Sequence, residues 1–240
     1  MEDTPWTQVP KGWPAASTSS MSNAKAACLR SLAVGKDGPV HLRLVDYYDT
    51  QSNHPGASFI ELDPAGPTDV TAGDLLAVSL LGIAMPPVAV RRLLGHCGHR
   101  LEVLNALQTM PDRELYMADK QTLVQMERLT EAVLRAVHDG TTGQADARAL
   151  AIALCARKRP DLFPVTDPSV SAFLGLGTSP DDRITWQVMW HVLGDREVLN
   201  AIDALKDDVE RETAGRVMAE SSRARVLFAT LATYLSASSP

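Results

Sequence analysis

The sequence contains few aromatic residues, few cysteines and no long apolar run, and each shortage excludes a class of protein. Aromatic residues make up 5% of the 240 positions. The three cysteines, Cys28, Cys97 and Cys155, form no Cys-x-x-Cys pair, which argues against a disulfide scaffold and for a reducing compartment. The longest apolar stretch, residues 75–85, is about half as long as the roughly 20 residues of a membrane span. With no basic and apolar signal segment at the N-terminus, we expect a cytoplasmic protein with no membrane partner.

Familiar catalytic motifs and uniform positive charge are also absent. No Walker loop, Gly-x-Gly-x-x-Gly fingerprint, Gly-x-Ser-x-Gly elbow or His-Glu-x-x-His pair occurs. The net charge is −6, and residues 44–90 hold six acids and no Lys or Arg. Residues 91–160, in contrast, hold eleven basic and eight acidic side chains. Any face that binds nucleic acid is therefore expected within residues 91–160.

Helix-forming residues are abundant, and they predict an all-α fold. The chain has 31 alanines and 29 leucines, the strongest helix formers, whereas strands favour β-branched and aromatic residues. We expect an irregular helical bundle with at most two short strands, one of them at residues 57–62; residues 40–49 fit either a short helix or a strand. Residues 1–20 should form a flexible arm and residues 21–240 a single helical domain of one or two lobes. Helices are expected over residues 22–35, 72–81, 87–94, 99–108, 122–138, 144–156, 168–174, 182–193, 196–213 and 221–236.

One segment carries a family resemblance. Residues 145–175 contain Ala-Arg-Lys-Arg-Pro, then Pro-Val-Thr-Asp and a helix ending in Leu-Gly. This stretch resembles a family of uncharacterised bacterial proteins, and the likeness covers most of residues 40–200. That family is in turn similar to the helix-hairpin-helix DNA glycosylases of the endonuclease III type. The resemblance implies a helix-hairpin-helix core over residues 122–175 and a catalytic aspartate at Asp167, twenty residues after Ala147.

The sequence departs from the glycosylase pattern at the hairpin. Ala145-Asp146-Ala147 stands where the family has a Gly-Val-Gly type hairpin that grips a DNA phosphate through backbone N–H groups. Ala149 stands where the bifunctional members have their lyase lysine, and no cysteine after Cys155 could hold an iron–sulfur cluster. If the chain is an enzyme, the resemblance therefore implies a monofunctional glycosylase-like hydrolase that uses Asp167 and no cofactor.

Two groups of residues could carry this chemistry, and each has a structural alternative. Asp167 could stabilise an oxocarbenium-like sugar or activate water, but Asp followed by Pro is also a typical start of a helix. Arg157, Lys158 and Arg159, with Arg148 upstream, could bind phosphates of a nucleic acid or nucleotide. Basic residues at a helix C-terminus are equally favoured by the helix dipole.

Two further patterns are ambiguous in the same way. Trp186 and Trp190 lie four residues apart and could stack on a base, although aromatic pairs at helical spacing commonly fill a core. His96-Cys97-Gly98-His99 contains three potential metal ligands, but no partner spacing resembles a zinc motif. We interpret this segment as a turn between helices and expect no metal site.

Two functional hypotheses remain open on the sequence. In the first, the chain is a glycosylase-like helical protein that contacts nucleic acid or a nucleotide-like ligand. In the second, the same scaffold serves as a protein-interaction module or acts on a small molecule without DNA chemistry. A positive groove next to Asp167 would favour the first hypothesis, and an acidic rim would favour the second.

Overall fold

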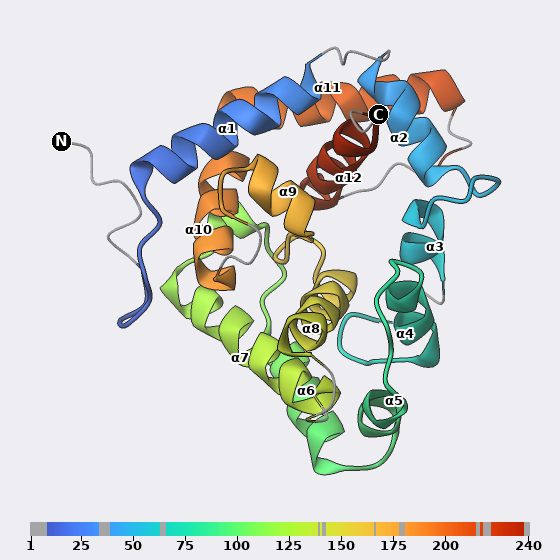
Figure 1. Cartoon of the computed structure of the whole chain (residues 1–240), viewed down its shortest axis with the longest axis vertical. Coiled ribbons are helices and arrows are strands. Elements are labelled where there is room, and N and C mark those ends of the chain that lie inside the picture. The colour runs from blue at the N-terminus through green and yellow to red at the C-terminus, as the bar shows by residue number, and fades with distance from the viewer. Residues whose placement is uncertain are drawn as a thin grey trace.

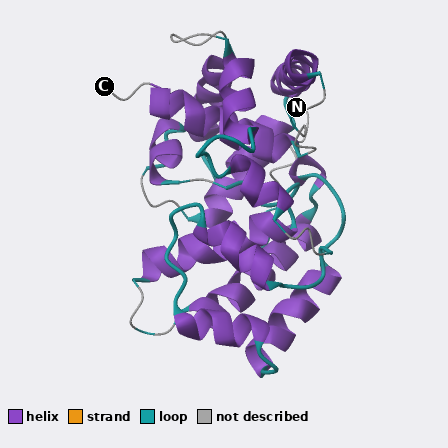
Figure 2. Cartoon of the chain, turned by 90° about the vertical axis from the view of Figure 1, so that its right-hand side faces the viewer, coloured by secondary structure: helices purple, strands orange, loops and turns teal. Residues whose placement is uncertain are grey.

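All regular structure in the described part of the chain is helical (Figure 2). The computed structural model describes residues 9–33, 39–62, 66–138, 140, 143–165, 167–177, 181–214, 217 and 222–237. Within these ranges the helices are α1 (Thr18–Leu32), α2 (Val40–Tyr48), α3 (Gly56–Glu61), α4 (Ala72–Ser79), α5 (Pro87–Leu94), α6 (Gly98–Thr109), the 3-10 turn η2 (Leu115–Met117), α7 (Lys120–Val137), α8 (Gln144–Lys158), α9 (Pro168–Phe173), α10 (Asp182–Leu193), α11 (Arg196–Thr213) and α12 (Arg223–Ala237).

The all-α prediction is confirmed, and most expected helices lie within a few residues of their predicted positions. Helix α4 begins with a capping box: the Thr71 side chain accepts from the Asp74 backbone N–H, and the Asp74 carboxylate accepts from the Thr71 backbone N–H. The first helix begins at Thr18 rather than near Ser22, because Ser17 supplies its N-cap. No described helix is both long and apolar enough to cross a bilayer.

The expected strand at residues 57–62 is wrong, because this segment forms helix α3. A six-residue helix is too short to be stable alone, and tertiary contacts hold it at both ends. A side chain at Gly56 would collide with the carbonyl and ring of Tyr47, so the first turn needs glycine there. At the other end, the guanidinium of Arg157 donates to the carbonyl oxygens of Phe59, Ile60 and Leu62. Composition alone carries no trace of these partners.

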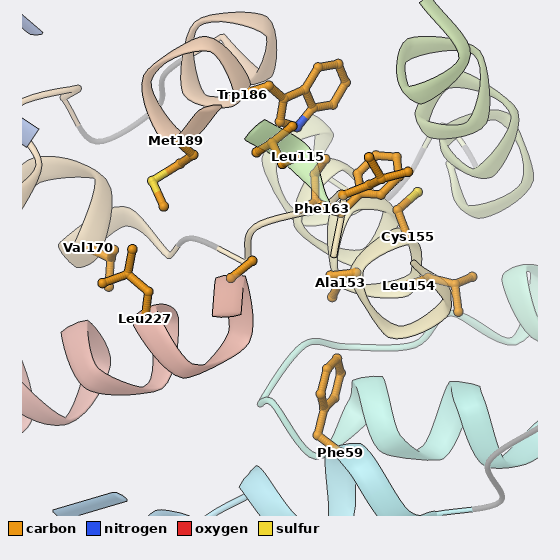
Figure 3. Close-up of a cluster of buried hydrophobic side chains, with 14 of the residues drawn as sticks. Phe59, Leu115, Ala153, Leu154, Cys155, Phe163, Val170, Trp186, Met189 and Leu227 are labelled. Atoms are coloured by element: carbon orange, nitrogen blue, oxygen red, sulfur yellow. The ribbon is translucent and has the colours of Figure 1, made fainter. Parts of the chain in front are cut away.

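The helices form two groups around one continuous core (Figure 1). Helices α4–α8 lie in one half of the molecule, whereas α1, α2 and α9–α12 lie in the other. Helix α3 lies between α2 and α4 and touches both groups. In the close-up of the core, Val170 meets Leu227 on one side, and Phe163 lies near Leu115 and Trp186 on the other (Figure 3).

Helix α8 is the central element, as its alanine-rich sequence predicts. Every residue from Leu150 to Lys158 is buried, so this half of the helix is covered on all sides. Its neighbours are α7, which packs along it as the preceding arm of a helical hairpin, and α4. The two helices expected within residues 122–156 are thus present; the loop residues 139, 141 and 142 between them lie outside the described ranges.

Candidate functional site

The predicted phosphate-binding run at the end of α8 points into the protein. The side chains of Arg157 and Lys158 are 3% and 2% exposed. Arg157 Nε lies 3.2 Å from Asp74 Oδ1, and Lys158 Nζ lies 2.8 Å from Asp74 Oδ2. We call Asp74, Arg157 and Lys158 the buried ion cluster. Because both cations are enclosed and paired, their burial conflicts with the expected role of meeting a phosphate at the surface.

The third residue of the run is also committed to the fold. Arg159 is half-buried, and its guanidinium donates to the carbonyl oxygen of Leu107 at 2.6 Å. Burial lowers the pKa of Arg159 from its ordinary value. The sequence correctly placed these cations at a helix C-terminus, but the carbonyl groups that Arg157 and Arg159 cap belong to other helices.

Arginines capping the C-terminal carbonyls of other helices are a repeated device in this fold. Arg157 caps α3, Arg159 caps the end of α6, and Arg225 donates to the last carbonyls of α8 at Ala156 and Arg157. Arg92 donates to the carbonyl of His138 at 2.8 Å, just past α7, and Arg100 donates to that of Leu93 in α5. Since the last carbonyls of a helix have no partner within it, these arginines stabilise helix ends.

The predicted catalytic aspartate is the N-cap of α9. The Asp167 carboxylate accepts a hydrogen bond from the Val170 backbone N–H at 2.7 Å, and the residue is exposed. Pro168 occupies the first helical position, as expected for such a start. The structural alternative therefore accounts for Asp167. The prediction that this carboxylate performs catalysis stays a prediction.

The two tryptophans pack mainly against other residues of the protein. Trp186 is 2% exposed, and its ring packs 5.8 Å from Trp13 and edge-on, 5.8 Å, to Phe163. Trp190 is partly buried, and its indole N–H donates to the Ala118 carbonyl at 3.2 Å. These contacts support the core-packing alternative over base stacking.

The His96–His99 segment forms the expected turn between α5 and α6. Cys97 is the N-cap residue of α6, and its Sγ donates to the Arg92 carbonyl at 3.2 Å. Among the residues that the structure describes, no three His, Cys, Asp or Glu side chains gather as metal ligands.

Arg148, a predicted phosphate-binding residue, lines an open cavity. A cleft of about 570 Å³ lies between α7, α8 and the first turns of α10. Arg148 Nε lies 2.8 Å from Asp182 Oδ2, and Arg183 pairs with the neighbouring Asp181 at 2.6 Å. We call this the acidic cleft, because four carboxyl groups face two guanidiniums. It is lined by Glu127, Thr130, Glu131, Leu134, Gln144, Ala145, Arg148, Asp181, Asp182, Arg183 and Trp186.

Two adjacent carboxyl groups of the acidic cleft have pKa values shifted in opposite directions. Burial raises the pKa of Asp182 to about 6, although the Arg148 guanidinium acts against the shift. Hydrogen bonds from Arg183 hold the pKa of Asp181 below its ordinary value. Carboxyl pairs whose environments separate their pKa values are typical of acid–base sites. Asp181 is ionised at neutral pH, whereas Asp182 exchanges its proton near pH 6.

A second cleft adjoins the first and is lined by basic side chains, of which Arg135 also pairs with Glu102 at 3.3 Å. It encloses about 550 Å³ and is lined by Arg92, His99, Leu134, Arg135, His138 and Gln144. Leu134 and Gln144 line both clefts, so the two are neighbours. We call it the basic cleft. Two of its liners lie at the start of helices without a side-chain cap, His99 in α6 and Gln144 in α8, and such helix starts favour anions.

Sequence reasoning missed the residues that define both clefts. Asp182, Arg183 and Glu127 come together only when α10 packs near α7 and α8, and the basic cleft combines side chains from α5, α6 and α7. The pair Asp181-Asp182 immediately before an apolar helix was the available signal, because two adjacent carboxyl groups cannot both act as the N-cap.

Comparison with known proteins yields one match. Residues 40–220 match the model of DUF6308, a family of unknown function. No curated protein and no solved structure matches the chain.

Proposed function

The chain is a member of the DUF6308 family, and we propose that it binds a phosphate-bearing, nucleotide-like small molecule across the basic and acidic clefts. In this proposal the basic cleft holds the phosphate, and the acidic cleft holds the sugar or base. The observation that carries the proposal is that two clefts adjoin. One is lined by two arginines and two histidines, and the other holds Asp182, whose pKa is raised to about 6.

Charge favours a small ligand over a nucleic acid. Glu127, Glu131 and Asp181 form an acidic rim beside the basic cleft, and such a rim would repel the successive phosphates of a polymer. Asp146, exposed in the first turn of α8, adds to this repulsion. The cations that the sequence offered for a longer phosphate track, Arg157 and Lys158, are buried. A single phosphate at the end of a small molecule avoids these obstacles.

Asp182 takes the acid–base role in this proposal. A carboxyl group with a pKa of about 6 is present in both protonation states near neutral pH, so it can donate a proton to a leaving group or accept one from water. This chemistry suits hydrolysis of a glycosidic bond, the reaction class implied by the glycosylase resemblance. We assign the role to Asp182 because Asp167 is engaged as a helix cap.

The helix-hairpin-helix relationship is part of the same proposal. It is supported by α7 and α8, which pack as an antiparallel pair, and by Asp167 at the start of the next helix. Both clefts lie where α7 gives way to α8, which is where the resemblance expects a phosphate contact.

The test is a titration of the intact protein with four probes: AMP, adenosine, inorganic phosphate and a duplex DNA. We expect AMP to bind more tightly than adenosine or phosphate alone, and DNA to bind weakly and only at low salt. Arg135→Ala should weaken AMP binding about tenfold, the size of one lost charge-assisted hydrogen bond of about 1.4 kcal/mol. Arg128→Ala is the matched control, because Arg128 is exposed on α7 and lines neither cleft.

Three outcomes would overturn the proposal. The first is that none of the probes binds. The second is that Arg128→Ala and Arg135→Ala weaken binding equally. The third is that DNA binds more tightly than AMP with a salt dependence of several phosphate contacts, which would favour a nucleic-acid function instead.

A further inference from the structure

The segment before α1 packs against two residues that line the acidic cleft, Glu127 and Trp186. In sequence, residues 9–17 look like a loose arm, and they lie outside the part of the chain that matches the family. In the structure they run beside α10 toward α7 (Figure 1). The residues that line the cleft lie within the region that matches the family, so a contribution from residues 9–17 would be additional to that region.

Gln187 of α10 holds the segment in place. This side chain is 1% exposed. Its Oε1 accepts from the Ala16 backbone N–H at 3.0 Å, and its Nε2 donates to the Pro14 carbonyl at 2.8 Å. Since a buried amide needs partners for both ends, Gln187 specifies a docked position for this backbone.

Trp13 reaches from the docked segment to two residues that line the cleft. Its ring packs against Trp186, and its indole N–H donates to Glu127 Oε2 at 3.1 Å. The other oxygen, Glu127 Oε1, lies 3.7 Å from Arg183 Nη1. Arg183 in turn donates from Nε and Nη2 to the Asp181 carboxylate. A continuous chain of polar contacts thus runs from Trp13 to Asp181, the N-cap of α10.

We propose that Trp13 is a positioning residue of the acidic cleft, acting through Glu127 on Arg183. By occupying one oxygen of Glu127, its indole N–H fixes which way this carboxylate faces and so where the oxygen that pairs with Arg183 lies. The position of the Arg183 guanidinium then determines how the carboxyl groups of Asp181 and Asp182 are oriented toward a ligand. This inference rests on the proposed function for its consequence in binding, but not for the contacts themselves.

The test compares Trp13→Phe, which keeps an aromatic ring but removes the indole N–H, with Glu127→Gln and the double variant. One readout needs no ligand: the Arg183 Nε–H resonance of the intact protein. We expect Trp13→Phe to shift this resonance in the wild-type background and to leave it unchanged in the Glu127→Gln background. Lys11→Ala, an exposed change in the same segment, should leave it unchanged in both. Retained exchange protection of the Ala16 amide would show that the segment stays docked.

The second readout is the dissociation constant for AMP. Trp13→Phe and Glu127→Gln should each raise it about threefold to tenfold, and the double variant should raise it no further than one of them does. An Arg183 resonance that ignores Trp13→Phe, or additive effects of the two changes, would overturn the positioning role. If wild-type protein fails to bind AMP, the proposed function fails, and the resonance alone then decides the role of Trp13.

Discussion

The two ends of helix α8 use the same kind of ion pair in opposite surroundings. At the C-terminal end, Arg157 and Lys158 enclose Asp74, which is 1% exposed. At the N-terminal end, Arg148 meets Asp182 at the edge of an open cleft, with side chains 41% and 16% exposed. One aspartate, Asp74, thus has two cations and a capping role, whereas the other, Asp182, has one cation.

The difference separates a group that holds the fold from one that is free to change protonation. Asp74 is surrounded by donors, so its carboxylate is fixed in place and its loss would leave two buried cations unpaired. Burial of Asp182 disfavours its ionised form more than the Arg148 guanidinium favours it, which raises the pKa of Asp182. Helix α8 is therefore fixed by buried ion pairs at its C-terminal end, whereas the carboxyl group near its N-terminal end, Asp182, can change its protonation state.

The largest expected effect is the loss of Asp74. Asp74→Asn removes the charge that balances Arg157 and Lys158 and weakens the capping box of α4. We expect a loss of about 3–5 kcal/mol in the free energy of unfolding, the cost of breaking a buried pair, measured by urea denaturation. Asp69→Asn, which breaks the exposed pair with Arg100, should cost less than about 1 kcal/mol. Equal losses of unfolding free energy in the two variants would mean that the buried pair stabilises the fold no more than the exposed pair does.

A pH effect at Asp182 comes next. Its native pKa of about 6 is higher than the ordinary value of 3.8, so between these pH values the native state binds more protons than the unfolded state. The stabilisation from this proton is complete below about pH 4 and is lost as pH rises through 6. Relative to Asp182→Asn, the wild type should lose up to about 3 kcal/mol over this range. A difference that stays flat with pH would mean that Asp182 has the same pKa in the native and unfolded states.

A smaller effect tests the capping role of Arg157 separately from its charge. Arg157→Lys keeps a cation near Asp74 but loses most of the donors to the carbonyls of α3. We expect a loss of about 2 kcal/mol, since hydrogen bonds from charged groups contribute roughly 1.5–3 kcal/mol each. Hydrogen exchange should rise in α3 more than in α4. If both helices exchange alike, the cluster acts through charge alone.

The smallest effect on stability is expected at Arg148. Because this side chain is 41% exposed, Arg148→Met should change the free energy of unfolding by less than about 1 kcal/mol. It should nevertheless raise the pKa of Asp182 further, since the guanidinium is the main influence that opposes burial. A carboxyl NMR titration measures this shift directly. An unchanged or lowered pKa would show that the pair is not electrostatically coupled.

Local signals in the sequence predicted the helices well, because they reside in short stretches of chain. The Thr71–Asp74 capping box and the Gly143–Gln144 start of α8 are readable from a few residues. Helix α3 was not, because Tyr47 and Arg157 decide its conformation and neither is a sequence neighbour. Tertiary contacts here override a composition that favours a strand.

The site was predictable only in part, for a related reason. Sequence places Arg157, Lys158 and Arg159 at a helix end but cannot show which carbonyls or carboxylates they meet; Asp74 lies 83 residues from Arg157. Arg148 lines the acidic cleft, and burial raises the pKa of its partner Asp182, which no local sequence pattern encodes.

The capping of α3 by Arg157 also sets an order of events during synthesis. The carbonyl of Phe59 lies 98 residues before the guanidinium that satisfies it. At translation rates of roughly 5–20 residues per second, the segment that becomes α3 waits about 5–20 s for its cap to be made. Since a helix of six residues does not persist unaided, the ribosome releases this stretch as unstructured chain. It becomes helical only when α8 docks, so a helix synthesised later completes the folding of α3.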